Sequence, residues 1–217
     1  MPPSAHAEPP NLTSFSEIDG EKAALRMMLR SRRAAAAALD RAHCGAAEVA
    51  LSGAYHRALP FPARGTVISA YVPMKDEISP EPLLADFENV GADHFDLTFA
   101  LPRTPSKGAG LPLSFHVLTP GTLVKSAFGV LEPPTAAPVV TPDILLVPLL
   151  GFDRQGHRLG YGAGHYDRTL AALRARRPVL AVGLAWACQE VDRIPTDVFD
   201  QPLDWVVTEN EAIGPLR

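Results

Sequence analysis

Apolar and small residues recur near the start of the chain at the spacing of an α-helix. Residues 20–42 ("GEKAALRMMLRSRRAAAAALDRA") are rich in good helix formers, and Ser16 or Asp19 is a candidate N-terminal cap. At about 3.6 residues per turn, apolar and basic residues separate onto different faces. The predicted apolar face holds Leu25, Met28, Leu29, Ala36 and Leu39, and the predicted basic face holds Lys22, Arg26, Arg30 and Arg33.

A second helix is predicted over residues 46–59, ending at Pro60, and the pattern then changes to short apolar runs rich in β-branched residues. Several runs are nearly continuous, which is typical of strands covered on both faces. Helical segments separate some of them. Ser79 can cap one such helix and Pro80 can begin it. The predicted strands are 66–72, 95–102, 143–150, 178–186 and 204–209, and the predicted helices between them are 79–90 and 166–176.

This order of elements predicts an α/β fold, a single-domain layered sheet that is mostly parallel with helices on both faces. No internal repeat and no linker divides the chain. We expect the domain to span residues 16–217. The proline-rich and polar residues 1–15 are predicted to be a disordered N-terminal tail.

Composition limits the possible partners of the protein. The 217 residues carry a net charge of -4, which argues against general nucleic-acid binding. No apolar segment is long enough to cross a bilayer, and the N-terminus lacks the pattern of a secretory signal. Cys44 and Cys188 are far apart and form no metal-binding motif. We therefore expect a cytoplasmic protein with a small-molecule partner, without nucleic acid or membrane.

The stretch "HRLGYGAGHYDRTL" (157–170) follows the predicted strand 143–150 and leads into a helix. Ligands of open α/β sheets gather at the carboxyl ends of strands, and a helix N-terminus there offers free N–H groups to an anion. Gly160, Gly162 and Gly164 would let the backbone approach phosphate oxygens closely. The alternative is a glycine-rich connection that serves packing alone.

Charged residues elsewhere strengthen the phosphate hypothesis. Lys22 and Arg26 share one helical face, where a phosphate would offset their repulsion, although a solvated basic face is the alternative. Asp167 and Asp200 could hold magnesium together with phosphate oxygens. Asp167 could instead complement the helix dipole, and Asp200 could be a turn residue.

Four further residues are candidates for the site, each with a simpler structural alternative. Glu77 follows a predicted strand but could be an exposed loop charge, and Glu132 has the same ambiguity. His165 could contact phosphate or cap its helix. Tyr166 could stack on a ligand or pack in the core.

Four stretches resemble the 5-formyltetrahydrofolate cyclo-ligase family, in the expected order from about Glu21 to Glu209. They are "KAALR" (22–26), "YVPMKDEISPEPLL" (71–84), "VPLLGFDRQGHRLGYGAGHYDRTL" (147–170) and "IPTDVFDQPLDWVVTE" (194–209). The third is highly specific. The chain departs from the family pattern at His165, where a tyrosine is more usual, and at Ala163, where glycine is frequent.

The resemblance implies an ATP-dependent enzyme that converts 5-formyltetrahydrofolate to 5,10-methenyltetrahydrofolate, releasing ADP and phosphate with magnesium. The formyl oxygen would be phosphorylated before ring closure. We expect a monomer, with a dimer as the alternative. A non-catalytic folate- and nucleotide-binding module of the same fold is an alternative function. A dinucleotide-dependent oxidoreductase is disfavoured because no GxGxxG motif follows the first strand.

The resemblance also implies a role for each site residue. The catalytic residues would be Lys22, Arg26, Arg158 and Tyr166. ATP would be bound by Lys22, Arg26, Arg158, Leu159, Gly160, Tyr161, Gly162, Ala163, Gly164, His165 and Tyr166. The folate would be bound by Arg26, Val72, Glu77, Tyr161 and His165, with Glu77 accepting hydrogen bonds from the pterin ring. Asp167 and Asp200 would hold Mg²⁺.

Overall fold

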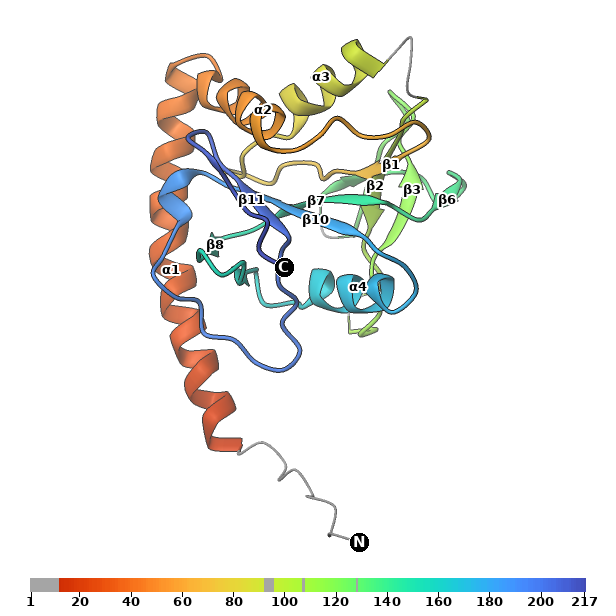
Figure 1. Ribbon diagram of the computed structural model, residues 1–217. Helices are drawn as coiled ribbons and strands as arrows, with labels where there is room; N and C mark the ends of the chain where they lie inside the picture. Colours follow the sequence, from red (N-terminus) through yellow and green to blue (C-terminus); the bar gives the residue numbers. More distant parts are fainter. Residues whose placement is uncertain (1–11, 92–95, 107, 128) are drawn as a thin grey trace, which may run out of the picture.

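An eight-stranded sheet forms the centre of the protein, in the order β12-β11-β10-β7-β1-β2-β3-β6 (Figure 1). The structure, a computed structural model, describes residues 12–91, 96–106, 108–127 and 129–217. Strands pair in parallel from β11 (Trp205–Val207) through β10 (Leu180–Leu184), β7 (Ile144–Pro148) and β1 (Val67–Ser69) to β2 (Thr98–Arg103). Antiparallel strands extend the edges, namely β12 (Ala212–Ile213), β3 (Ser114–Val117) and β6 (Val139–Val140). The predicted α/β fold with a mostly parallel sheet is confirmed.

Helices cover both faces of this sheet, as predicted. Helices α2 (Ala46–Ala58) and α3 (Glu81–Gly91) lie on one face and α4 (His165–Arg174) lies on the other, while α1 (Leu12–Ala42) runs along the side (Figure 1). The backbone N–H of Glu81 bonds to the Ser79 hydroxyl at 3.2 Å, consistent with the predicted cap of α3.

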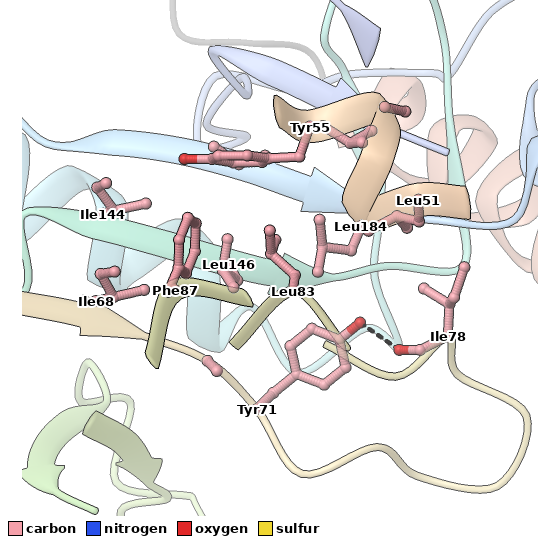
Figure 2. Close-up of a cluster of buried hydrophobic side chains, with 14 of the residues drawn as sticks. Leu51, Tyr55, Ile68, Tyr71, Ile78, Leu83, Phe87, Ile144, Leu146 and Leu184 are labelled. Carbon is pink, nitrogen blue, oxygen red and sulfur yellow. Dashed lines mark hydrogen bonds between the residues drawn. The ribbon is translucent and has the colours of Figure 1, made fainter. Parts of the chain in front are cut away.

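Two apolar cores hold these layers together. Figure 2 shows Leu83 and Phe87 of α3 beside Ile68 and Leu146 of the sheet, and Leu51 of α2 on the side of Leu184, all in one core. On the opposite face, Leu170 of α4 belongs to a second core with Leu145, Val147, Ala181 and Val206. Each fully buried side chain of this size contributes about 1.5–3 kcal/mol of transfer free energy.

Helix α1 differs from the prediction in its start and in its buried face. It begins at Leu12, so neither Ser16 nor Asp19 is its cap, and residues 12–15 are helical while residues 1–11 lie outside the described residues. Leu39 is 63% exposed, whereas Lys22 and Arg33, assigned to the polar face, are 6% and 3% exposed. The separation into apolar and basic faces was therefore wrong in part. It failed because these two cations are paired with carboxylates from distant segments, which offsets the cost of their burial.

Short hairpins lie outside the main sheet, and one of them positions the glycine loop. Strands β4 (Val124–Lys125) and β5 (Leu131–Glu132) pair with each other, as do β8 (Gly151–Phe152) and β9 (Arg158–Leu159). The fully buried Asp153 accepts backbone N–H bonds from Gln155, His157 and Ile194, which fixes the turn before β9. A short 3-10 helix, η1 (Ala187–Gln189), follows β10. The sequence patterns did not predict these elements.

A helix that crosses a bilayer is long and predominantly apolar. In the described ranges, no helix meets that requirement.

Candidate functional site

A cleft of about 900 Å³ opens at the carboxyl ends of β1, β2 and β7. Tyr71 and Val72 follow β1, Thr104 follows β2, and Pro148 ends β7, and all of them line this cleft. Every site residue expected from the sequence also lines it. Those residues are Lys22, Arg26, Val72, Glu77, Arg158, Leu159, Gly160, Tyr161, Gly162, Ala163, Gly164, His165, Tyr166, Asp167 and Asp200.

The glycine loop, residues 160–164, forms one wall of the cleft against α1. Arg26 donates from Nε to the carbonyl oxygen of Gly160 at 2.9 Å. Gly162 has a φ of +99°, and a Cβ there would lie 3.6 Å from the Arg26 guanidinium carbon. Gly164, with a φ of +64°, is the residue before α4. The loop thus carries a backbone that favours glycine, beside a cation and a helix N-terminus.

Lys22 joins α1 to the segment 197–200 on the same side of the cleft. Its Nζ lies 2.7 Å from Oδ2 of Asp200 and 3.0 Å from Oδ2 of Asp197. Burial lowers the pKa of Lys22, but the hydrogen bonds and charges of the two carboxylates outweigh burial and raise the pKa above its ordinary value. Lys22 is therefore a permanent cation, placed about one helical turn from Arg26.

Asp197 was missed by the sequence reasoning. Burial raises the pKa of its carboxyl, but hydrogen bonds from Lys22 and from backbone N–H groups leave the pKa below its ordinary value. The signal that could have found it is the spacing of two aspartates in "DVFD", which lets both carboxylates face one lysine.

Arg158 and Asp167 form a second ion pair beneath the glycine loop. Nη2 of Arg158 donates to Oδ1 of Asp167 at 2.6 Å, and the Arg158 side chain is 5% exposed. The backbone N–H of Gln201 donates to the same oxygen at 3.1 Å. Since Gln201 follows Asp200, this bond brings the two predicted magnesium ligands to the same region. Nε of Arg158 is buried, and no described residue accepts a hydrogen bond from it.

The two aspartates fit a magnesium ion only in part. Among the described residues, no group of three or more His, Cys, Asp or Glu side chains could hold a metal. Asp167 and Asp200 each use one oxygen for a cation, Oδ1 toward Arg158 and Oδ2 toward Lys22. The second oxygen of each carboxylate remains as a ligand for a metal ion. Such a pair suits Mg²⁺ that takes its other ligands from phosphates and water.

Glu77 also lines the cleft. Its Oε2 accepts the backbone N–H of Met74 at 2.8 Å, and its Oε1 accepts the hydroxyl of Tyr161 at 2.7 Å. Arg33, from α1, lies 3.8 Å from Oε1. Burial raises the pKa of Glu77, and the Met74 N–H, Tyr161 and Arg33 oppose that rise. The result is a buried carboxylate, suited to accepting N–H groups from a ligand.

The remaining predicted residues contribute in different ways. Leu159 packs with Leu29 and Ile194, so its side chain serves a core while it also borders the cleft. Tyr166 packs against the core below α4, with the Arg158 guanidinium 5.8 Å from its ring centre. Burial lowers the pKa of His165, and Arg168 lowers it further, which favours a neutral imidazole. Ala163 is exposed, and its carbonyl oxygen accepts from Arg168.

Two candidates left open by the sequence are now placed. Glu132 is 6% exposed, lines the cleft and pairs with Arg103 at 3.0 Å. Glu77 is not an exposed loop charge, since it is also 6% exposed.

Comparisons with known proteins agree on one family. The 5-formyltetrahydrofolate cyclo-ligase family profile matches residues 18–209. A protein of Mycolicibacterium smegmatis named 5-formyltetrahydrofolate cyclo-ligase is 37% identical over 70% of this chain and 78% of its own length. The Escherichia coli protein of the same name is 30% identical over 67% of this chain and 79% of its own length.

Solved structures give the same result for the fold. The 5,10-methenyltetrahydrofolate synthetase of Aquifex aeolicus has a TM-score of 0.68 and 28% identity, covering 90% of this chain and 93% of that one. The synthetase of Mycoplasma pneumoniae has a TM-score of 0.65 over 87% of this chain and 98% of its own, with 22% identity, and supports the fold alone.

Proposed function

The chain belongs to the 5-formyltetrahydrofolate cyclo-ligase family, and we propose that its cleft is where this reaction takes place. It is an ATP-dependent enzyme that converts 5-formyltetrahydrofolate to 5,10-methenyltetrahydrofolate. The observation that carries the site assignment is one cleft lined by both a cationic, glycine-rich wall and a buried carboxylate. The first matches a triphosphate and the second matches the N–H groups of a pterin ring.

The proposed chemistry makes a poor leaving group into a good one. The formyl oxygen attacks the terminal phosphorus of ATP, so an O–P bond forms as the bond to ADP breaks. The neighbouring aniline nitrogen then attacks the formyl carbon and loses its proton, and the C–O bond breaks with its electron pair leaving on phosphate. Such a transfer depends on positioning and on neutralising charge over the phosphoryl oxygens, and it needs no nucleophilic side chain.

The phosphate end is assigned to α1, the glycine loop and the start of α4. Lys22 and Arg26 would bind phosphate oxygens as cations, and Arg158 would do so through its buried guanidinium. The backbone N–H groups of residues 160–164 and of the first turn of α4 would complete the cradle. Tyr166 would position Arg158 through its ring face.

We assign magnesium to the remaining oxygens of Asp167 and Asp200. When bound, Mg²⁺ would neutralise charge on the phosphates. The pairing of these carboxylates with Arg158 and Lys22 would orient them toward the same region.

The folate end is assigned to Glu77, Val72 and Tyr161. The Glu77 carboxylate would accept the pterin N–H groups, and Val72 would supply apolar contact. Arg26 and His165 would meet the folate where it approaches the phosphates. A neutral His165 could accept or donate a hydrogen bond there.

We also propose a cytoplasmic monomer. Cys44 and Cys188 are free thiols, as in reducing compartments. Light scattering during size-exclusion chromatography would give the mass of the monomer. A mass of twice that value would favour the dimer.

The function is tested by incubating the purified protein with 5-formyltetrahydrofolate, ATP and Mg²⁺. We expect the absorbance of the methenyl product to rise only when ATP is present. Folded protein that gives no ATP-dependent rise would reject the function. Folate binding without nucleotide hydrolysis, measured by calorimetry, would favour a binding module instead.

A further inference from the structure

We propose that Arg33 is a positioning residue for the folate, acting through Glu77 and the hydroxyl of Tyr161. The inference rests on the proposed function, in which Glu77 holds the pterin ring. Arg33 lies on α1 about three turns beyond Lys22, and it does not line the cleft. Neither the sequence motifs nor the resemblance points to this arginine.

The contacts place Arg33 behind the carboxylate. Nη1 of Arg33 donates to the Tyr161 hydroxyl at 2.7 Å, and the same hydroxyl donates to Oε1 of Glu77 at 2.7 Å. Arg33 Nη1 also lies 3.8 Å from Oε1 directly. The guanidinium carbon is 5.5 Å from the centre of the Tyr161 ring, so the arginine contacts both the hydroxyl and the face of this side chain.

Because Arg33 and Glu77 are both buried, their arrangement depends on each charge being compensated by the other. The side chains of Arg33 and Glu77 are 4% and 3% exposed, while Tyr161 is 39% exposed and borders the cleft. Removing either member of a buried ion pair leaves the other charge uncompensated. Tyr161 therefore connects the buried Arg33–Glu77 ion pair to the cleft in which the folate would bind.

The backbone of Glu77 is held by contacts that do not involve Arg33. The Tyr71 hydroxyl donates to the carbonyl oxygen of Ile78 at 2.6 Å (Figure 2), and Nε1 of Trp186 donates to the carbonyl oxygen of Asp76 at 2.9 Å. The N–H of Met74 fixes Oε2. Arg33 therefore favours the ionised form of Glu77 and orients Oε1. It does not determine the backbone path around Glu77.

Several groups face Glu77 and affect its ionisation. Burial raises its pKa, and the Met74 N–H, the Tyr161 hydroxyl and Arg33 lower it in that order of importance. The phenols of Tyr71 and Tyr166 lie near enough to interact with its charge. Asp76, the adjacent residue, is paired with Arg41 at 3.6 Å. Burial, with the charge of Glu77, raises the pKa of Tyr161 to about 12, so its hydroxyl stays protonated and can donate.

The test compares Arg33→Met with the parent enzyme across pH. Without the arginine the pKa of Glu77 rises further, so a larger fraction of the carboxyl is protonated at a given pH and it accepts fewer pterin N–H bonds. We expect the KM for 5-formyltetrahydrofolate to rise about tenfold at neutral pH and to recover as the pH is raised. We expect the KM for ATP to change less than about twofold, because the contacts of Arg33 run to the side chains of Tyr161 and Glu77 rather than to the backbone N–H groups of the glycine loop.

Matched controls separate this role from a structural one. Arg32→Met removes an exposed arginine of the same helix, and both KM values should stay at parental levels. Arg33→Lys keeps the charge but loses the planar fork, so the pH profile should return toward that of the parent. Equal rises in both KM values, or a rise in folate KM that is the same at every pH, would overturn the proposal.

Further variants keep the test decisive. If Arg33→Met does not fold, Tyr161→Phe removes the bridging hydroxyl at a partly exposed position, and the folate KM should shift with pH in the same direction. An unchanged pH profile would then overturn the proposal. Glu77→Gln is measured in parallel. A parental folate KM in that variant would reject the site assignment itself, whereas a raised KM beside unaffected Arg33 variants would reject only the role of Arg33.

Discussion

At the scale of single residues, the cations of the proposed phosphate end are paired with carboxylates. Lys22 contacts both Asp197 and Asp200, and Arg158 contacts Asp167. Sequence reasoning found most members of these pairs because their residue types suit phosphate and magnesium. Sequence reasoning could not show which of these residues pair with each other, since Lys22 and Asp200 are 178 residues apart. Arg33 was missed for the same reason, because a basic helix face looks alike whether it is solvated or paired.

Lys22→Ala should weaken the use of ATP more than the use of folate. The variant removes a cation from the phosphate end and leaves Asp197 and Asp200 to repel the triphosphate. We expect the KM for ATP to rise at least about tenfold, with a smaller effect on folate KM. Initial rates with each substrate varied in turn measure this. Arg30→Ala, an exposed change on the same helix, is the control, and equal effects in the two variants would count against the assignment.

Asp200→Asn should change the magnesium requirement. The amide keeps the size of the side chain but provides a weaker ligand and no charge for Lys22. We expect half-maximal activity to need about tenfold more Mg²⁺. A magnesium titration at saturating ATP measures the shift, with Asp192→Asn as an exposed control in the same region. If both variants show the parental titration, Asp200 is not a magnesium position.

At the scale of elements, the glycine loop is positioned from both sides. The loop follows directly after the β8–β9 hairpin, and Arg26 of α1 donates a hydrogen bond to the carbonyl oxygen of Gly160, the first residue of the loop. The sequence predicted the helices and parallel strands well, because continuous apolar runs and helix formers mark elements that are buried by their neighbours. The antiparallel strands β3, β6 and β12 were missed. They are only two to four residues long, too short for an alternating pattern to be recognised.

Gly162→Ala tests the loop. An alanine at a φ of +99° is strained by about 1–3 kcal/mol and places a methyl group 3.6 Å from the Arg26 guanidinium carbon. We expect a several-fold rise in the KM for ATP together with a lower melting temperature. Gly65→Ala is the matched control, since its φ is +76° and nothing lies within 4 Å of the added Cβ. The control should lose stability alone, and a similar loss of ATP use there would contradict the role of the loop.

At the scale of the whole molecule, one cleft gathers segments from the first helix, the sheet edge and the last third of the chain. The family resemblance predicted this convergence, whereas the residue patterns alone left each segment with a simpler alternative. A ligand that binds such a site stabilises the whole fold, because the segments it joins are separated on unfolding.

ATP with Mg²⁺ should therefore raise the melting temperature. At about one hundred times the dissociation constant, binding adds about 2.7 kcal/mol, which corresponds to about 5–10 °C for a domain of this size. Differential scanning fluorimetry measures the shift. Lys22→Ala should show a smaller shift at the same concentrations, and an equal shift in both proteins would place the nucleotide elsewhere.

The most direct measurement follows the formyl oxygen itself. The substrate is prepared with an isotopically heavy formyl oxygen and turned over with ATP and Mg²⁺, and the released phosphate is analysed by mass spectrometry. If the cleft brings the terminal phosphoryl group to that oxygen, the heavy label appears in inorganic phosphate, one atom for each molecule of methenyl product. Label released into water, with unlabelled phosphate, would contradict the account.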